Sequence, residues 1–125
     1  MVFRYKTGMK SIDVISIPVS DQEASKQFYM KVGFRVLEES PMGDGKRWIR
    51  MGLEGSATTI TLVNWFSKMP PGSMQGLVLR TDNIVDELVI LQKNGISCSG
   101  IEKASHGQFL SFRDPDGNGL SFQQR

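Results

Sequence analysis

Residues 114–119, with the sequence DPDGNG, match the opening of a calcium-binding loop, because acidic and amide side chains alternate before a glycine. A calcium loop of this kind also needs a bidentate glutamate at its twelfth position and flanking helices. Arg125 occupies that twelfth position. The sequence therefore predicts a tight turn, in which Gly117 or Asn118 adopts a positive φ and the last strand follows.

One histidine and one cysteine are the other residues that could carry out proton transfer or nucleophilic chemistry. Histidine is the residue type used most often for acid–base catalysis, but no carboxylate close in sequence would orient His106 and no serine nucleophile motif accompanies it. We interpret it as a loop residue that contacts ligand or solvent. Cys98 excludes an internal disulfide, agrees with a reducing compartment, and is interpreted as a small half-buried residue in a strand.

The composition indicates one globular domain, residues 1–125, long enough to bury a core without disulfides. Hydrophobic residues make up 39% and charged residues 22% of the chain, and no apolar run approaches the length of a membrane span. The N-terminal residues Met1–Lys10 lack the apolar region of a signal peptide, so we expect a cytoplasmic protein. The net charge is +2 and the basic residues are scattered, which argues against a nucleic-acid or membrane partner.

An internal repeat emerges when Asp21 is aligned with Asn83 and Gly33 with Gly95. Each half then reads as a strand, a polar helix cap, a helix, a glycine and three further strands. Those three strands are expected at 34–39, 47–52 and 58–63 in the first half and at 96–101, 108–113 and 119–123 in the second. The sequence therefore predicts two βαβββ modules, at about 11–64 and 76–124, joined by a linker at 65–75.

The helices have sequence signals for their starts and buried faces. Ser20 and Glu23 form a capping-box pattern at the start of the first helix. Apolar residues at every fourth position predict its buried stripe: Ala24, Phe28 and Val32. The second helix is expected to begin near residues 82–83 and to bury Ile84, Leu88 and Leu91.

Three stretches, in this order, resemble the glyoxalase/bleomycin-resistance/extradiol-dioxygenase superfamily, also called the vicinal oxygen chelate superfamily: IPVSDQEASKQFYMKVGFRV, GLVLRTDNIVDELVILQKNGI and FRDPDGNGLSF. The resemblance covers nearly the whole chain after about residue 11. It implies an α+β fold in which two βαβββ modules form a curled mixed sheet around a cavity, with the helices on the outer face. It also implies a homodimer.

Enzymes of this superfamily hold a divalent metal ion with His, Glu or Gln side chains at four strand positions. The residues at the corresponding positions here are Val14, Thr61, Gly76 and Ser121. Valine and glycine offer no donor, and neutral hydroxyls are weak ligands for transition metals. We therefore expect no metal and no other cofactor, and the metal-dependent isomerisation, ring-cleaving and thiol-transfer activities are not carried over.

Strand alternation indicates which residues face the cavity rather than the helices. The candidates are Val14, Trp48, Arg50, Thr61, Trp65, Gly76, Arg80, Phe109 and Ser121, together with the loop residue His106. Aromatic walls, hydroxyls and guanidinium groups would suit a small, partly planar or anionic organic ligand. In the alternative interpretation the tryptophans are packing residues and the two arginines reach solvent, where they could pair with Glu38 or Glu102.

Three kinds of function fit these features. In the first, the protein binds a small organic compound without a metal, like drug-sequestering members of the superfamily, although a slightly basic chain is a poor match for cationic bleomycin. The second is a glyoxalase-type lyase or dioxygenase-related enzyme of unknown substrate, in which an arginine or His106 would provide charge or a proton. The third is a dimeric interaction module. The first is favoured, because neither a ligand set nor a nucleophile supports the second and the fold alone does not fix a function.

Overall fold

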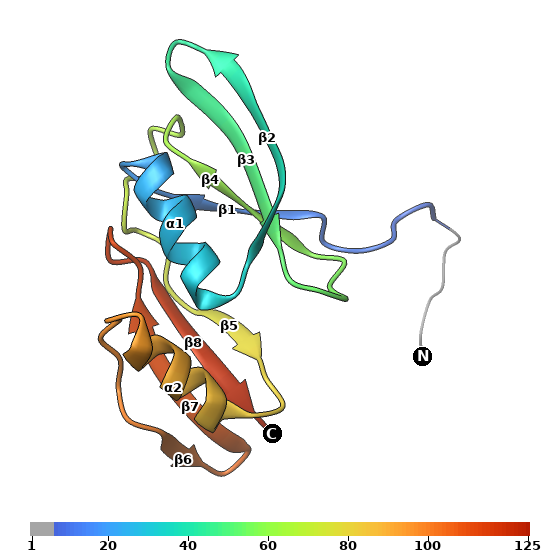
Figure 1. Cartoon of the computed structure of the whole chain (residues 1–125). Helices are drawn as coiled ribbons and strands as arrows, with labels where there is room; N and C mark the ends of the chain where they lie inside the picture. The colour runs from blue at the N-terminus through green and yellow to red at the C-terminus, as the bar shows by residue number, and fades with distance from the viewer. Residues whose placement is uncertain (1–6) are drawn as a thin grey trace.

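A computed structural model describes residues 7–125, and the first six residues of the N-terminal segment, 1–6, lie outside the described part. The first unit of the chain consists of β1 (Val14–Pro18), α1 (Gln22–Val32), β2 (Arg35–Gly43), β3 (Lys46–Gly52) and β4 (Thr59–Val63) (Figure 1). The second unit consists of β5 (Leu77–Arg80), α2 (Ile84–Lys93), β6 (Glu102–Ala104), β7 (Gly107–Arg113) and β8 (Gly119–Gln124). The element order is the predicted βαβββ repeat.

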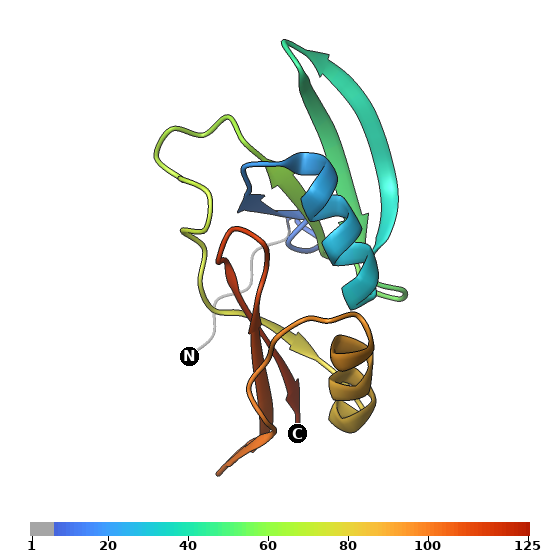
Figure 2. The same ribbon diagram turned by 60° about the vertical axis from the view of Figure 1, so that its left-hand side comes forward.

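The eight strands of the described residues form two separate four-stranded sheets. Their strand orders are β1-β4-β3-β2 and β5-β8-β7-β6, and in each sheet the first pair is parallel and the others are antiparallel. Each helix packs on its own sheet, and α1 and α2 contact each other (Figures 1 and 2). The α+β class and the paired modules are confirmed, and the two mixed sheets remain open rather than closing into a barrel. Within residues 7–125, neither helix is long and apolar enough to cross a membrane.

The core lies between the helices and one face of each sheet, as strand alternation predicts. The first sheet buries Ile17, Ile49, Met51, Ile60 and Leu62, and the second buries Leu110, Phe112, Leu120 and Phe122. From α2, Ile84 and Leu91 are fully buried as predicted, and Leu88 is half-buried. These side chains form one cluster that runs through both units, so apolar burial stabilises the units together.

The segment 96–101, predicted as a strand, is irregular apart from one bridge between Cys98 and Phe112. The Ser99 hydroxyl accepts the hydrogen bond from Ser111 N, at 2.9 Å, that a strand carbonyl would otherwise accept. Ser99 N donates in turn to the Ser111 carbonyl oxygen at 2.8 Å. A side chain thus replaces part of the backbone ladder, and strand β6 begins only at Glu102.

The predicted capping box at the start of α1 is wrong. Asp21 is the N-cap, and its Oδ1 accepts a hydrogen bond from Ala24 N at 3.0 Å. Ser20 Oγ donates instead to Asp116 Oδ1, in the second unit, at 2.6 Å. The start of α2 agrees with the prediction, because Asn83 is its N-cap.

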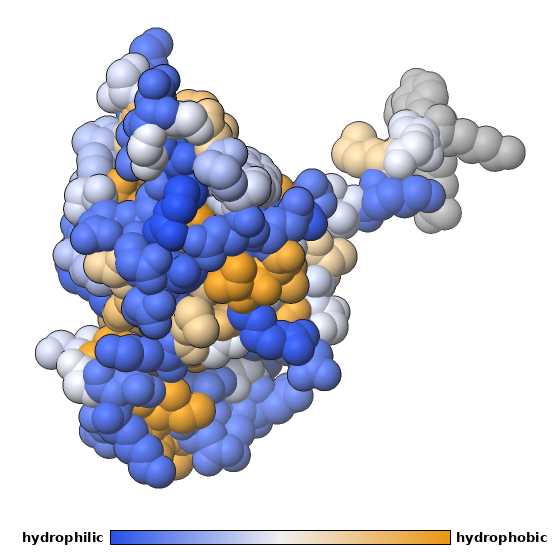
Figure 3. All heavy atoms as spheres, turned by 45° about the horizontal axis from the view of Figure 1, so that its top comes forward, coloured by the Kyte–Doolittle hydropathy of each residue, from blue (hydrophilic) through white to orange (hydrophobic). Residues whose placement is uncertain are grey.

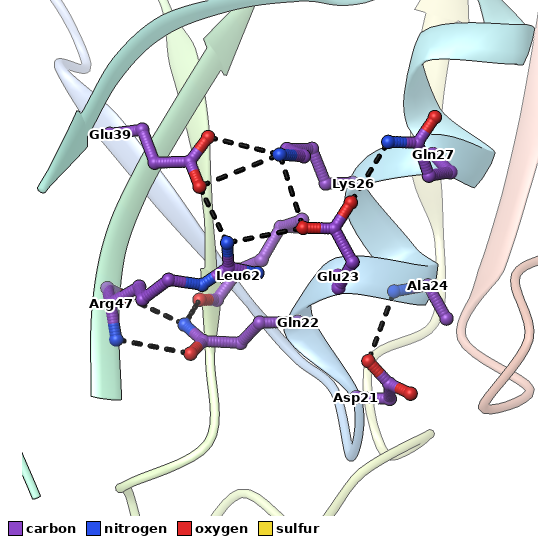
Figure 4. Close-up of polar contacts among 9 residues, drawn as sticks. All are labelled: Asp21, Gln22, Glu23, Ala24, Lys26, Gln27, Glu39, Arg47 and Leu62. Atoms are coloured by element: carbon purple, nitrogen blue, oxygen red, sulfur yellow. Dashed lines mark hydrogen bonds and ion pairs between the residues drawn. The ribbon is translucent and has the colours of Figure 1, made fainter. Parts of the chain in front are cut away.

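The buried face of α1 also differs from the predicted stripe. Ala24 is exposed and Phe28 is half-buried, and the residues that are buried are Gln22, Ser25, Tyr29 and Val32. Gln22 can be buried because its amide is hydrogen-bonded. Its Nε2 donates to the carbonyl oxygens of Arg47 and Leu62 at 2.7 and 2.8 Å, and its Oε1 accepts from Arg47 N at 3.1 Å (Figure 4). A polar residue that fastens the helix to the sheet therefore takes a core position.

Four charged side chains hold α1 to the β2–β3 hairpin at the surface (Figure 4). Glu39 lies 3.1 Å from Lys26 Nζ and 2.6 Å from Arg47 Nη1, and Glu23 lies 3.2 and 3.1 Å from the same two atoms. Hydrogen bonds from Gln27, Lys26 and Arg47 lower the pKa of Glu23 from 4.5 to about 2. Hydrogen bonds to Glu39 and Glu23 raise the pKa of Lys26. Folding therefore favours the ionised forms of Glu23 and Lys26.

Glu23→Gln should lower the free energy of unfolding at neutral pH but not in strong acid. Because folding lowers the pKa of Glu23 from 4.5 to about 2, its contribution is fully present above pH 4.5 and is lost as the pH falls through about 2. Urea unfolding of wild type and E23Q, measured between about pH 2 and about pH 7, should show a difference that disappears in acid. Glu54→Gln, at an exposed glutamate without an ion pair among residues 7–125, is the control. A difference that stays constant across this range would show that ionisation of Glu23 is not the cause.

The DPDGNG turn between β7 and β8 is a buried junction. Gly117 supplies the positive φ, at 95°, as one of the two predicted alternatives requires. Asp114 and Asn118 are 5% and 0% exposed. Asp114 Oδ1 accepts from the backbone N–H groups of Asp116 and Asn118 at 2.9 Å, and Oδ2 accepts from Asn118 Nδ2 and the Tyr29 hydroxyl at 2.8 Å. These hydrogen bonds occupy the carboxylate that a calcium loop would use, so the turn interpretation holds.

The same turn ties the second unit to the first unit and to the linker. Asn118 Nδ2 donates to the Pro18 carbonyl oxygen at 2.8 Å, and Asn118 Oδ1 accepts from Met74 N at 3.0 Å. Asp116 accepts hydrogen bonds from both the backbone N–H and the hydroxyl of Ser20. Six residues of loop thus connect three parts of the chain that are distant in sequence.

Asn118→Ala should lower the free energy of unfolding by about 3 kcal/mol or more, because it removes three side-chain hydrogen bonds at a fully buried position and takes away the acceptor of Met74 N. Tyr29→Phe should cost about 1–2 kcal/mol, since Asp114 keeps its other donors. Urea titration measures both costs. Asn64→Ala, at an exposed asparagine outside the junction, should cost less than about 0.5 kcal/mol. Equal stability of the N118A and N64A variants would contradict the importance of the junction.

Candidate ligand-binding site

The four residues expected at the superfamily's metal positions lie in or next to β1, β4, β5 and β8: Val14, Thr61, Gly76 and Ser121. Thr61 is 1% exposed, and its hydroxyl shares a hydrogen bond with the Ser16 hydroxyl at 3.3 Å. Within residues 7–125, no three His, Cys, Asp or Glu side chains lie close enough together to hold a metal ion. The side chains at these four positions therefore do not fit a transition-metal ion.

The first sheet leaves the face opposite α1 uncovered by a helix, and Trp48 and Arg50 of β3 belong to it. Arg50 lies opposite Thr61 in the β3–β4 ladder. Its Nε is 2.6 Å from Glu38 Oε1, and its Nη1 is 4.0 Å from Asp13 Oδ1. The Glu38 oxygen lies out of line with the buried Nε–H bond, so the contact is an ion pair rather than a hydrogen bond. The alternative interpretation of this arginine, a pairing with Glu38, is therefore present, and its charge is compensated.

The second sheet leaves an equivalent face uncovered, with Arg80 and Phe109 on it. Both lie opposite Gln123, on either side of β8. The Phe109 ring meets the His106 ring edge to face, with centroids 5.4 Å apart. Arg80 is exposed and has no carboxylate within 4.0 Å among residues 7–125, so the alternative pairing with Glu102 is not formed. This guanidinium is available to an anionic group.

One chain does not bring the ten candidate residues together in a single cavity. The first sheet carries Val14, Trp48, Arg50 and Thr61, and the second carries Arg80, Phe109 and the adjacent His106. Trp65 follows β4, with its ring 6.1 Å from that of Phe66. The remaining two, Gly76 and Ser121, line a cleft of about 880 Å³ that adjoins the second sheet, since Ser121 shares a face of β8 with Gln123. The ten candidates are dispersed because the two units form separate sheets instead of one continuous surface.

The sequence gives little indication of this cleft. Phe28 and Lys31 of α1 line one side, and residues 94–99 and Arg113 line the other. Helical periodicity assigns Phe28 to the core, but its side chain lies half-buried at the edge of the cleft. The sequence pattern of α1 therefore gives only a weak indication that Phe28 lines a cleft. The rest depends on how α1 packs against the second unit, which local patterns do not contain.

A family model and several known proteins match this chain over most of its length. The family model described as "Glyoxalase/Bleomycin resistance protein/Dioxygenase superfamily" matches residues 11–122. The crystal structure of TnmS3, an antibiotic binding protein from Streptomyces sp. CB03234, is 39% identical, covers 95% of this chain and 98% of its own, and gives a TM-score of 0.89. A glyoxalase/bleomycin resistance protein from the same organism is 42% identical, covers 91% of this chain and 100% of its own, and gives a TM-score of 0.83. Uncharacterized protein YetH of Bacillus subtilis (strain 168) is 31% identical over 115 residues, which are 88% of this chain and 94% of YetH.

The family match spans both βαβββ units and the junction between them. The sheet topology agrees with it, because each unit repeats the same strand order and the same parallel pair. On its sequence and its fold, the chain belongs to the glyoxalase/bleomycin resistance protein/dioxygenase superfamily.

Proposed function

We propose that this protein binds a small organic molecule without a metal ion, and that the ligand is an aromatic compound of the antibiotic type. The observation that carries the proposal is the 39% identity to the antibiotic-binding protein TnmS3 over 95% of this chain, with a TM-score of 0.89. A relationship that close supports the same kind of function. The individual compound has to be found from the chemistry of the site.

The uncovered sheet faces support a planar ligand with an anionic group. Trp48 on the first sheet and Phe109 on the second offer aromatic surface on which flat rings can stack. Arg50 is paired with Glu38, whereas Arg80 has no carboxylate partner within the described residues. We therefore assign Arg80 to a carboxylate of the ligand, through a charge-assisted hydrogen bond.

We also propose that two copies of the chain complete the site. Each uncovered face belongs to a separate sheet, so one chain supplies two half-sites. Hydrophobic patches interrupt the hydrophilic surface (Figure 3), and large apolar side chains are exposed on the edge strands β2 and β5: Val36, Leu37, Met42 and Val78. In a homodimer the first sheet of one chain would face the second sheet of its partner, which would enclose the ligand and cover apolar surface.

Binding without turnover is the activity that the side chains support. The superfamily's metal positions offer two weak hydroxyl ligands, from Thr61 and Ser121, and no imidazole or carboxylate. His106 is exposed, and its Nδ1 lies 3.2 Å from Ser105 Oγ rather than beside a carboxylate. A cytoplasmic location is part of the proposal, in keeping with the single cysteine, Cys98.

Isothermal titration calorimetry with planar aromatic antibiotics that carry a carboxylate, nalidixic acid and ciprofloxacin, tests the proposal. We expect saturable binding to wild type that persists in EDTA. Trp48→Ala and Arg80→Gln should each weaken binding by about tenfold or more, because they remove a stacking surface and a charged hydrogen-bond donor. Arg35→Gln, at an exposed arginine of edge strand β2 without an ion pair among residues 7–125, should leave the affinity unchanged.

Two results would contradict this assignment. Binding that EDTA abolishes and a divalent metal restores would favour a metal-dependent site. Equal affinity of wild type, W48A and R80Q would place the ligand elsewhere on the protein. Sedimentation velocity on the same samples tests the homodimer separately, since a monomer with bound ligand would reject the shared site and keep the binding function.

A further inference from the structure

The cleft of about 880 Å³ lies between α1 and the second unit, apart from the sheet-face residues Trp48, Arg50, Arg80 and Phe109. Its walls are one face of α1, the segment 94–99 that follows α2, and the adjoining ends of β7 and β8. In Figure 2 the segment after α2 passes beneath the C-terminal end of α1. The volume suits a small molecule, since such sites usually measure roughly 300–1,000 Å³.

One part of the cleft is aromatic and apolar. The rings of Phe28 and Phe112 have centroids 6.3 Å apart, and both line the cleft. Leu120 and the half-buried Cys98 extend this surface. Phe112 and Leu120 are only 4% and 3% exposed and form the floor beneath. A flat apolar group would therefore lie against the half-buried Phe28 and Cys98, where it would lose contact with water and gain packing.

The cleft also carries uncompensated positive charge. Lys31 and Arg113 line it, both are exposed, and neither has a carboxylate within 4.0 Å among residues 7–125. Lys26 and Arg47, on the neighbouring surface of the first unit, are both paired with Glu39. The charges of Lys31 and Arg113 are therefore not neutralised by a close carboxylate of the described residues.

The acidic residue in the lining does not cancel this charge at short range. Asp114 is 5% exposed, and both of its carboxylate oxygens accept hydrogen bonds within the junction. Serine hydroxyls add further donors, because those of Ser97, Ser111 and Ser121 line the cleft and make no hydrogen bond to another described residue. An anion that enters would meet two cations and several donors.

We propose that this cleft is a second ligand site, specific for a small organic anion such as an aromatic carboxylate. The flat body of the ligand lies on the half-buried Phe28, which packs on the buried ring of Phe112, and its carboxylate binds Lys31 and Arg113. Two of the residues that the sequence assigns to the cavity, Gly76 and Ser121, belong to this site. Ser121 lies on the same face of β8 as Gln123, the neighbour of Arg80 and Phe109, so the cleft adjoins that sheet face. The variants at Lys31 and Arg113 test the cleft alone.

Cys98 gives a direct readout, because it is the only cysteine and it lines the cleft. We would measure the rate at which iodoacetamide alkylates Cys98 in the native protein, by intact mass, with increasing 2-naphthoate. Saturating 2-naphthoate should slow alkylation several-fold. Lys31→Gln and Arg113→Gln should each raise the concentration needed for half-protection by about tenfold, because each removes a charged donor. Neutral 2-naphthamide should protect only at much higher concentration.

Arg80→Gln is the matched control, because Arg80 is also exposed and without an ion pair among residues 7–125 but lies outside the cleft. R80Q should keep wild-type protection. The proposal is overturned if 2-naphthoate leaves the alkylation rate unchanged, if K31Q and R113Q behave like wild type, or if R80Q loses protection as they do. Failure of the antibiotic titration would not produce any of these results, so the two sites are tested separately.

Discussion

The buried carboxylate of Asp114 is the interaction on which the arrangement of the two units depends. A charged group with 5% exposure is tolerated only when its oxygens are hydrogen-bonded. Its donors come from its own turn and from Tyr29 of α1, and Asn118 extends the network to Pro18 and Met74. The turn resembles a calcium loop because both place oxygen atoms at alternate positions. Here N–H and O–H groups stand where a cation would be, so the motif serves structure.

The position of this junction explains where ligands can bind. The units are joined by the turn and by a shared core on the helix side, so both sheets keep their opposite faces uncovered. One face carries a compensated arginine, Arg50, and the other an uncompensated one, Arg80. The same packing holds α1 over the second unit, which brings Phe28 and Lys31 to the edge of a cleft. The two proposed sites are therefore consequences of one inter-unit contact.

Local patterns were sufficient to predict the repeat, the α+β class and the core-facing residues of β3, β7 and β8, because alternation and helix caps such as Asn83 depend on near neighbours in sequence. Local patterns gave wrong predictions where a residue's contact is with a part of the chain that is distant in sequence. Ser20 fits a capping box, but its hydrogen-bond partner Asp116 lies 96 residues away. Gln22 takes a core position because backbone groups of β3 and β4 satisfy its amide. The cleft could not be predicted, since it exists only through the packing of α1 against the second unit.

The proposed metal-free function depends on the residues expected at the superfamily's metal positions, Val14, Thr61, Gly76 and Ser121, none of which is a histidine or a carboxylate. The most direct test of the metal-free function is elemental mass spectrometry of untagged protein purified without chelator. Thermal unfolding in zinc, nickel, manganese and iron(II) accompanies it. We predict less metal than protein by a wide margin and no rise in Tm with any of the four ions. One tightly held ion per chain, with a matching rise in Tm, would contradict the metal-free function and bring glyoxalase-type catalysis forward.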